Sequence, residues 1–92
     1  MANVKNINTG KIISAEEYYH SLTKSFIEEH TNQEVSVQNI QNWVDYDTDF
    51  YLVDDLGQAF EGKEPPYELT SECDRLYDEY IETCKEYFGL AA

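Results

Sequence analysis

The spacing of apolar residues in the last quarter of the chain is the feature that most constrains the fold. Apolar and aromatic side chains recur there every three or four residues, which is the period of one face of an α-helix. The members of this stripe are Cys73, Leu76, Tyr77, Tyr80, Cys84, Tyr87 and Phe88. The pattern predicts a long helix that Thr70 or Ser71 caps and that ends at Gly89, where a left-handed C-terminal cap is expected.

Two further helices are predicted in the first half of the chain. Ser14 and Glu17 have the spacing of a capping box, so a helix is expected to start after Ser14 and to continue to about His30. Its predicted buried stripe is Ala15, Tyr18, Tyr19, Leu22 and Phe26. After a polar break at residues 31–33, a second apolar pattern predicts a shorter helix capped near Ser36. Its members are Val37, Ile40, Gln41 and Val44.

Short strands are predicted at both sides of these helices. Residues 1–7 and 11–13 flank the turn-forming sequence Asn-Thr-Gly and are interpreted as two short strands. The apolar run at residues 50–53 favours a third strand, and residues 58–60 are a candidate for its returning hairpin arm. Two consecutive prolines place a loop at residues 62–66. The predicted fold class is α+β, with two long helices and one short helix against a small antiparallel sheet or hairpin.

A single domain over residues 1–92 is expected, because a chain of this length supports one hydrophobic core. No apolar run approaches the roughly 20 residues that cross a bilayer, and the N-terminus lacks the features of a secretory signal. The expected location is therefore the cytoplasm. The residues predicted to form the core are Tyr18, Leu22, Phe26, Ile40, Leu52, Leu76, Tyr80 and Phe88.

The two cysteines are predicted to remain free thiols. Cys73 and Cys84 lie on the same predicted helix, eleven residues apart. That separation corresponds to about 16 Å of helix, whereas a disulfide needs Cα atoms within about 7 Å. They are interpreted as small apolar residues of the buried face.

The distribution of charge carries the strongest functional signal. The chain has 19 acidic and 6 basic residues, for a net charge of −13. Residues 1–44 hold five acids and three bases, for a net of −2, whereas residues 45–92 hold fourteen acids and three bases, for a net of −11. Such an excess destabilises a compact domain by self-repulsion, so it favours a role in solubility or in binding a positively charged partner. Direct binding of nucleic acid is not expected, because phosphate contacts need Lys and Arg.

The acidic segment that follows the second predicted helix has only part of a calcium-binding pattern. Asp45, Asp47 and Asp49 match the alternate carboxylates that start an EF-hand loop. The sixth position of that loop is Phe50 instead of glycine, and the twelfth is Leu56 instead of a bidentate glutamate. No metal site is therefore predicted.

Catalysis and cofactor binding are not expected either. Both histidines, His20 and His30, belong to a different predicted helix from the two cysteines, so no nucleophile has a base beside it. The chain also lacks a glycine-rich phosphate loop. We therefore expect a binding protein without cofactor rather than an enzyme.

Two features favour a binding surface over a solvated helix face. Before Arg75 and Lys85 are subtracted, the last predicted helix holds six carboxylates, roughly one per 4.5 Å, against one charge per about 3.4 Å along each strand of B-form DNA. Six of the eight tyrosines lie in the same acidic half, and tyrosine is enriched at interface hot spots. Trp43 is interpreted equally as a core or an interface residue. The predicted partner-binding residues are Asp45, Tyr46, Asp47, Asp49, Tyr51, Asp54, Asp55, Tyr67, Asp74, Asp78, Glu79, Glu82 and Glu86.

In size, charge and aromatic-plus-acidic composition, residues 43–49 and 74–86 resemble small acidic inhibitors of phages and mobile elements. These are anti-CRISPR proteins, DNA-mimic antirestriction proteins and inhibitors of uracil-DNA glycosylase. The resemblance implies stoichiometric inhibition of a basic nucleic-acid-binding enzyme through its DNA-binding cleft, and it favours an anti-CRISPR protein against a CRISPR effector nuclease in a bacterial host. The alternative is an acidic interaction module, such as a regulatory or structural subunit of a phage. The oligomeric state stays open.

Overall fold

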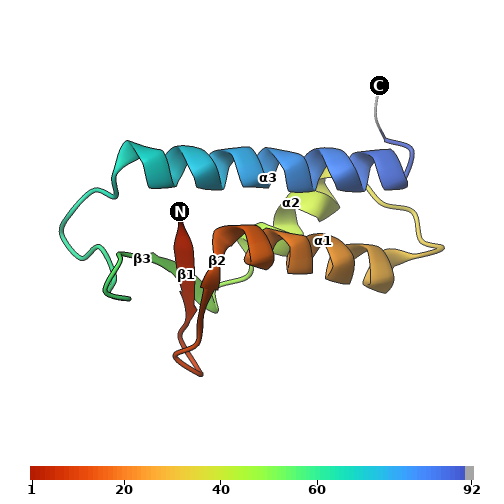
Figure 1. Cartoon of the computed structure of the whole chain (residues 1–92). Helices are drawn as coiled ribbons and strands as arrows, with labels where there is room; N and C mark the ends of the chain where they lie inside the picture. Colours follow the sequence, from red (N-terminus) through yellow and green to blue (C-terminus); the bar gives the residue numbers. More distant parts are fainter. Residues whose placement is uncertain (91–92) are drawn as a thin grey trace.

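The computed structural model describes residues 1–90 and shows an α+β fold, with three helices and a three-stranded antiparallel sheet (Figure 1). This confirms the predicted fold class. The molecule measures 41 × 27 × 19 Å. In chain order, the elements are β1 (Asn3–Asn6), β2 (Ile12–Ser14), α1 (Ala15–His30), α2 (Val37–Asp45), β3 (Phe50–Val53) and α3 (Tyr67–Tyr87).

The sheet has β1 at its centre, between β2 and β3, and β1 pairs antiparallel with both neighbours. Val4 lies opposite Ile13 on one side and opposite Leu52 on the other, so the three side chains share one face of the sheet. That face packs against the helices. Figure 1 shows α1 and α3 side by side and running in the same direction, with the sheet beside their N-terminal halves.

The expected hairpin between residues 50–53 and 58–60 forms only in part, since β3 pairs along its length with β1 and residues 58–60 form no strand. Only one isolated bridge, between Val53 and Ala59, joins β3 to the following segment. The Asp54 carboxylate accepts hydrogen bonds from the backbone N–H groups of Leu56 and Gln58, both at 2.9 Å. This side chain closes a local turn, and the chain then leaves the sheet.

The N-termini of α1 and α2 follow the predicted caps. The Ser14 side chain accepts a hydrogen bond from the backbone N–H of Glu17 at 3.1 Å. Ser36 and Asn39 form a complete capping box, in which each side chain accepts from the other residue's backbone N–H. These bonds satisfy N–H groups that the first turn of a helix leaves without partners.

The predicted start of the last helix at Thr70 or Ser71 is wrong, since α3 begins at Tyr67, directly after Pro66. Proline is tolerated there because the first N–H groups of a helix have no intrahelical acceptor. The Thr70 and Ser71 hydroxyls donate back to the carbonyls of Tyr67 and Glu68, so they lie inside the first turns and do not cap them.

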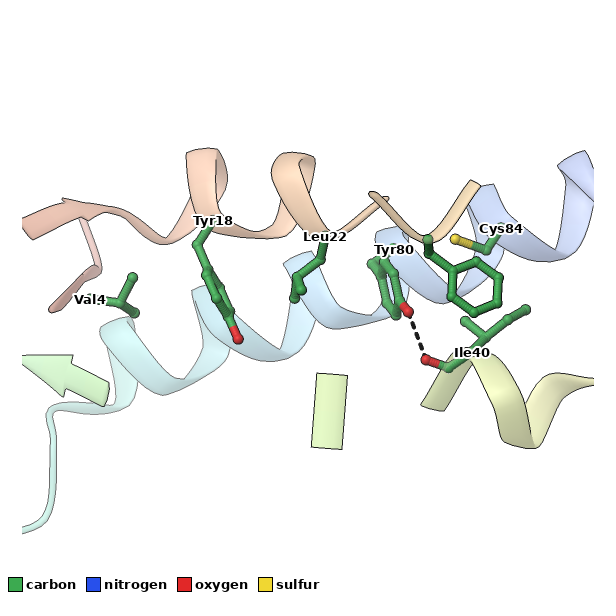
Figure 2. Close-up of a cluster of buried hydrophobic side chains, with 7 residues drawn as sticks. Val4, Tyr18, Leu22, Ile40, Tyr80 and Cys84 are labelled. Carbon is green, nitrogen blue, oxygen red and sulfur yellow. Dashed lines mark hydrogen bonds between the residues drawn. The ribbon is translucent and has the colours of Figure 1, made fainter. Parts of the chain in front are cut away.

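The core forms where α1, α2 and α3 meet the sheet, and Figure 2 shows its larger cluster. Six of the eight predicted core residues are buried, whereas Leu52 and Phe88 are only partly buried. Tyr87 was predicted on the buried stripe but is 56% exposed. Phe88 and Leu90 instead pack against the cluster at that end of α3. The sequence-based core did not include Ala2, Val4 and Val53, which are also buried.

One hydrogen bond crosses the centre of this core. The Tyr80 hydroxyl donates to the Ile40 carbonyl at 2.7 Å, which ties α3 to α2 (Figure 2). Among residues 1–90, no helix combines the length and the apolarity that crossing a membrane requires.

Candidate partner-binding surface

A row of carboxylates lines the outer face of α3. Asp74, Asp78, Glu82 and Glu86 follow one another at intervals of four residues, and all four are exposed. Each step along the row rises about 6 Å along the helix axis. The row is therefore a line of negative charges whose spacing is fixed by the helix backbone.

A groove of about 530 Å³ runs beside this row. One wall is the carboxylate row, and the other is the adjacent row of α3 residues that begins at Tyr67 and continues through Arg75. The predicted site residues in the groove are thus brought together by one helix. The groove is lined by Tyr67, Ser71, Asp74, Arg75, Asp78, Glu79 and Glu82.

Two of the α3 carboxylates are partly compensated by bases on the same helix. Arg75 contacts Glu79 at 2.8 Å, and Lys85 lies 3.5 Å from Glu82. Both pairs are exposed at their acidic end, where ion pairs have little effect on stability. Within the described part of the chain, Asp74 and Asp78 form no ion pair. The first half of the row therefore has no compensating base.

The acidic segment after α2 forms a second part of the surface. The Tyr18 hydroxyl donates to Asp47 Oδ2 at 3.0 Å, and the backbone N–H of Asp49 donates to Asp47 Oδ1 at 3.0 Å. Asp47 is thus held in place by α1 and by its own loop. Asp45 and Tyr46 are exposed at the end of α2, and Tyr46 keeps 78% of its surface accessible.

These two acidic regions act on the same tyrosines. Burial raises the pKa of Tyr77, and the charges of Asp45 and Asp78 raise it further. Burial likewise raises the pKa of Tyr19 to about 12, with smaller contributions that include Asp74 and Asp45. Because carboxylates from α2 and α3 both influence these hydroxyls, their negative potentials overlap at this side of the molecule.

The remaining predicted site residues lie on the sheet side. Tyr51 is paired with Lys5 of β1, on the face of the sheet opposite to Val4 and the helices. Asp54 is used by the turn after β3, and Asp55 is exposed at its tip. The structure therefore divides the thirteen predicted residues between the α3 groove with the end of α2, and the separate sheet side.

A cleft of about 520 Å³ opens between α1 and the C-terminal end of α2. It contains Tyr46, Asp47 and Asp49 from the prediction, together with residues that the sequence analysis did not assign to a site. Asn39, Asn42, Trp43 and Tyr46 recur at three- or four-residue spacing, so a helical reading of residues 37–46 could have grouped them. The complete lining is Leu22, Ser25, His30, Asn39, Asn42, Trp43, Tyr46, Asp47 and Asp49.

The described residues contain neither an activated cysteine nucleophile nor a cluster of metal ligands. Cys73 and Cys84 are free thiols, and burial raises the pKa of Cys84 to about 11. A thiol of this kind stays protonated and is a poor nucleophile at neutral pH. In residues 1–90, no three His, Cys, Asp or Glu side chains are grouped in a way that could hold a metal ion.

No protein-family model, curated protein sequence or solved structure matches the chain.

Proposed function

We propose that this protein is a stoichiometric inhibitor that places its acidic surface in the DNA-binding cleft of a basic nucleic-acid-binding enzyme. The favoured class is an anti-CRISPR protein that acts on a CRISPR effector nuclease in the cytoplasm of a bacterial host. The protein then needs no cofactor, performs no catalysis and does not itself bind nucleic acid, because its charge has the wrong sign for phosphate.

The observation that carries this proposal is the carboxylate row on α3. The helix of 21 residues is about 32 Å long and holds seven acidic residues against two bases, and the four carboxylates of the row lie about 6 Å apart along its axis. A strand of B-form DNA carries one phosphate per about 3.4 Å of axis. Lys and Arg side chains that hold a phosphate backbone therefore meet a regular line of negative charge on α3, at roughly half the linear density of a DNA strand.

The end of α2 extends this charged face beyond one helix. Asp45 and Asp78 both raise the pKa of Tyr77, after the larger effect of burial, so charges from α2 and α3 act at the same hydroxyl. A cleft shaped for a duplex is wider than one helix, and a face built from two elements suits it better than an isolated α3.

A second candidate function is an acidic interaction module of a phage or mobile element, such as a regulatory or structural subunit. The exposed aromatic residues favour it, because Tyr46 and Tyr67 offer contact area without charge. Inhibitors of restriction enzymes or of uracil-DNA glycosylase share the proposed mechanism and differ only in the target.

Neutralising the α3 row tests the proposal. The triple variant Asp74→Asn, Asp78→Asn, Glu82→Gln is expected to slow association with the target by about tenfold or more, because steering depends on these charges. Association is measured by surface plasmon resonance against a panel of CRISPR effector nucleases, a restriction enzyme and a uracil-DNA glycosylase. Added salt is expected to weaken wild-type binding steeply, and target DNA is expected to be displaced.

The matched control changes the same charge on the other half of the chain. Glu16, Glu28 and Glu29 are exposed on α1, so replacing all three by Gln also adds three units of charge. This control is expected to retain most of the association rate. If both triple variants lose association rate equally, the effect is due to net charge and not to the α3 row. If the α3 triple variant inhibits fully while the target keeps its DNA bound, DNA mimicry is contradicted.

A further inference from the structure

We propose that the cleft between α1 and α2 is a receptor for a single arginine side chain of the partner. The inference deepens the proposed function, because a protein that binds a basic cleft meets arginine side chains there. It is carried by the shape and lining of the cleft, and these are independent of the α3 row.

Aromatic rings supply the walls of the cleft. Trp43 is half-buried, and its ring centroid lies 5.8 Å from that of Phe26 and 5.1 Å from that of His30. Its indole N–H donates to Ser25 Oγ at 3.1 Å, which fixes the orientation of the ring. The His30 ring is stacked on Phe26, and its Nδ1 donates to the Phe26 carbonyl at 2.8 Å.

Carboxylates supply the charge. Asp47 is oriented by the Tyr18 hydroxyl and by the Asp49 backbone N–H, so its position does not depend on a ligand. The Asp49 side chain accepts no hydrogen bond from residues 1–90, and neither Lys nor Arg lines the cleft. A bound cation would therefore meet two carboxylates and no competing positive side chain.

Aromatic walls together with two carboxylates favour a guanidinium over an ammonium or a phosphate group. Two carboxylates reject phosphate and other anions. A planar guanidinium stacks on aromatic faces and donates in a fork that matches a carboxylate, whereas an ammonium does neither as well. The amide oxygens of Asn39 and Asn42, on the same wall, already accept from the Ser36 backbone N–H and from the Gln38 side chain, so the two carboxylates are the acceptors for the guanidinium. The volume of about 520 Å³ admits a whole arginine side chain.

The chain has one tryptophan, so its fluorescence reports on the cleft directly. The probe is a capped tripeptide with a central arginine, titrated at mildly alkaline pH, where histidine is neutral, and at low salt. Matched peptides carry lysine or neutral citrulline. We expect saturable changes in Trp43 fluorescence and in its indole N–H resonance with the arginine peptide, weaker binding of lysine and none of citrulline.

Two single variants separate the cleft from the general negative field. Asp49→Asn is expected to weaken binding of the arginine peptide by about tenfold, because a charge-assisted contact is lost. Glu16→Gln removes the same charge from an exposed position at the start of α1, outside the cleft, and is expected to change binding by less than about twofold. Circular dichroism verifies that both variants are folded.

Equal weakening in both variants, equal affinity for lysine and arginine, or the absence of saturable binding would each overturn the receptor. The titration contains no target enzyme, so its outcome is separate from that of the α3 triple. If the arginine peptide binds but the protein inhibits none of the target enzymes, the arginine receptor stands and DNA mimicry is rejected. Loss of arginine binding with intact inhibition would reject the cleft alone.

Discussion

Tyr80 shows how a single side chain can combine burial with a polar contact. Its ring lies in the core at 1% exposure, and its hydroxyl donates to the Ile40 carbonyl. A buried hydroxyl without a partner would be costly, so this bond is what allows tyrosine instead of phenylalanine at the centre of the core. It also fixes the position of α2 relative to α3.

The variant Tyr80→Phe is expected to lower the free energy of unfolding by about 1 kcal/mol, because it removes this hydrogen bond and retains the ring. Urea denaturation measures the change. Tyr87→Phe is the matched control on the same helix, since Tyr87 is mostly exposed, and its effect is expected to be near zero. Equal effects of the two variants would show that the bond to Ile40 does not stabilise the fold.

The burial of Tyr80 could be predicted from its spacing to Leu76 and Cys84, but its bonding partner could not. Periodicity describes one helix at a time, whereas Tyr80 and Ile40 are forty residues apart in the chain. Val4 was missed for a related reason. It is a single apolar residue in a short polar strand, and its burial results from the position of β1 in the middle of the sheet.

The C-terminal end of α3 depends on one backbone conformation. Gly89 has φ of +69°, and its backbone N–H donates to the Glu86 carbonyl at 3.2 Å. The backbone N–H of Leu90 donates to the Lys85 carbonyl at 2.7 Å. These two bonds form a Schellman motif, which satisfies carbonyls that the last turn leaves free.

Gly89→Ala is expected to destabilise the protein by about 1 kcal/mol, because an L-residue is strained at this φ. No atom lies within 4 Å of the position of the added Cβ, so a steric clash does not contribute. Thermal and urea denaturation measure the effect. Gly89→Asn is expected to cost less, since asparagine tolerates the left-handed region. Alanine and asparagine of equal stability would contradict the backbone explanation.

The two ends of α3 differ in how well the sequence predicts them. Glycine at the end of an apolar stripe has few other uses, so Gly89 was identified correctly. At the start, proline and two hydroxyl residues all fit a helix N-terminus, and the sequence alone does not rank them. Residues 58–60 were a candidate hairpin arm, but only Ala59 bridges β3, because a turn at residues 60–63 follows directly and takes the chain away from the sheet.

At the scale of the whole molecule, the tyrosine hydroxyls and the cysteine thiol in and around the core predict that stability falls at alkaline pH. Burial raises the pKa values of Tyr18 and Tyr80, that of Tyr19 to about 12, and that of Cys84 to about 11. Each group therefore holds its proton more tightly in the folded state. This stability is complete below the ordinary pKa values of 9.0 for cysteine and 10.0 for tyrosine, and it is lost as pH rises above them.

We expect the free energy of unfolding to fall above pH 10 by about 1.4 kcal/mol per pH unit for each such tyrosine. Urea titrations at a series of alkaline pH values measure the slope. Tyr80→Phe removes one of these groups, so its slope is expected to be smaller by the contribution of one tyrosine. An unchanged slope in that variant would mean that Tyr80 ionises equally in the folded and unfolded states.

The candidate site was predicted only as a set of residue types. The partition of charge identified the acidic half correctly as a matter of composition, but it could not show which carboxylates share a surface. The acidic members of the α3 groove share one helix face, which the helical pattern alone implies, whereas Tyr67 joins them only because α3 begins there and not at Thr70 or Ser71. Tyr51 and the turn at Asp54 lie away from the α3 groove, because β3 pairs with β1. The cleft could not be predicted from single elements, because it forms only where α1 packs beside α2.

The central position of β1 determines the order in which the nascent chain can fold. β1 leaves the ribosome before both of its neighbours, and β2 follows after a short turn. β3 emerges only after α1 and α2, so until then one edge of β1 exposes unpaired backbone groups. The apolar face of the sheet gains its cover from the N-terminal half of α3, around Leu69 and Leu76, which emerges after all three strands. The sheet and α1 can therefore pair first, and the docking of α3 completes the core as the last step.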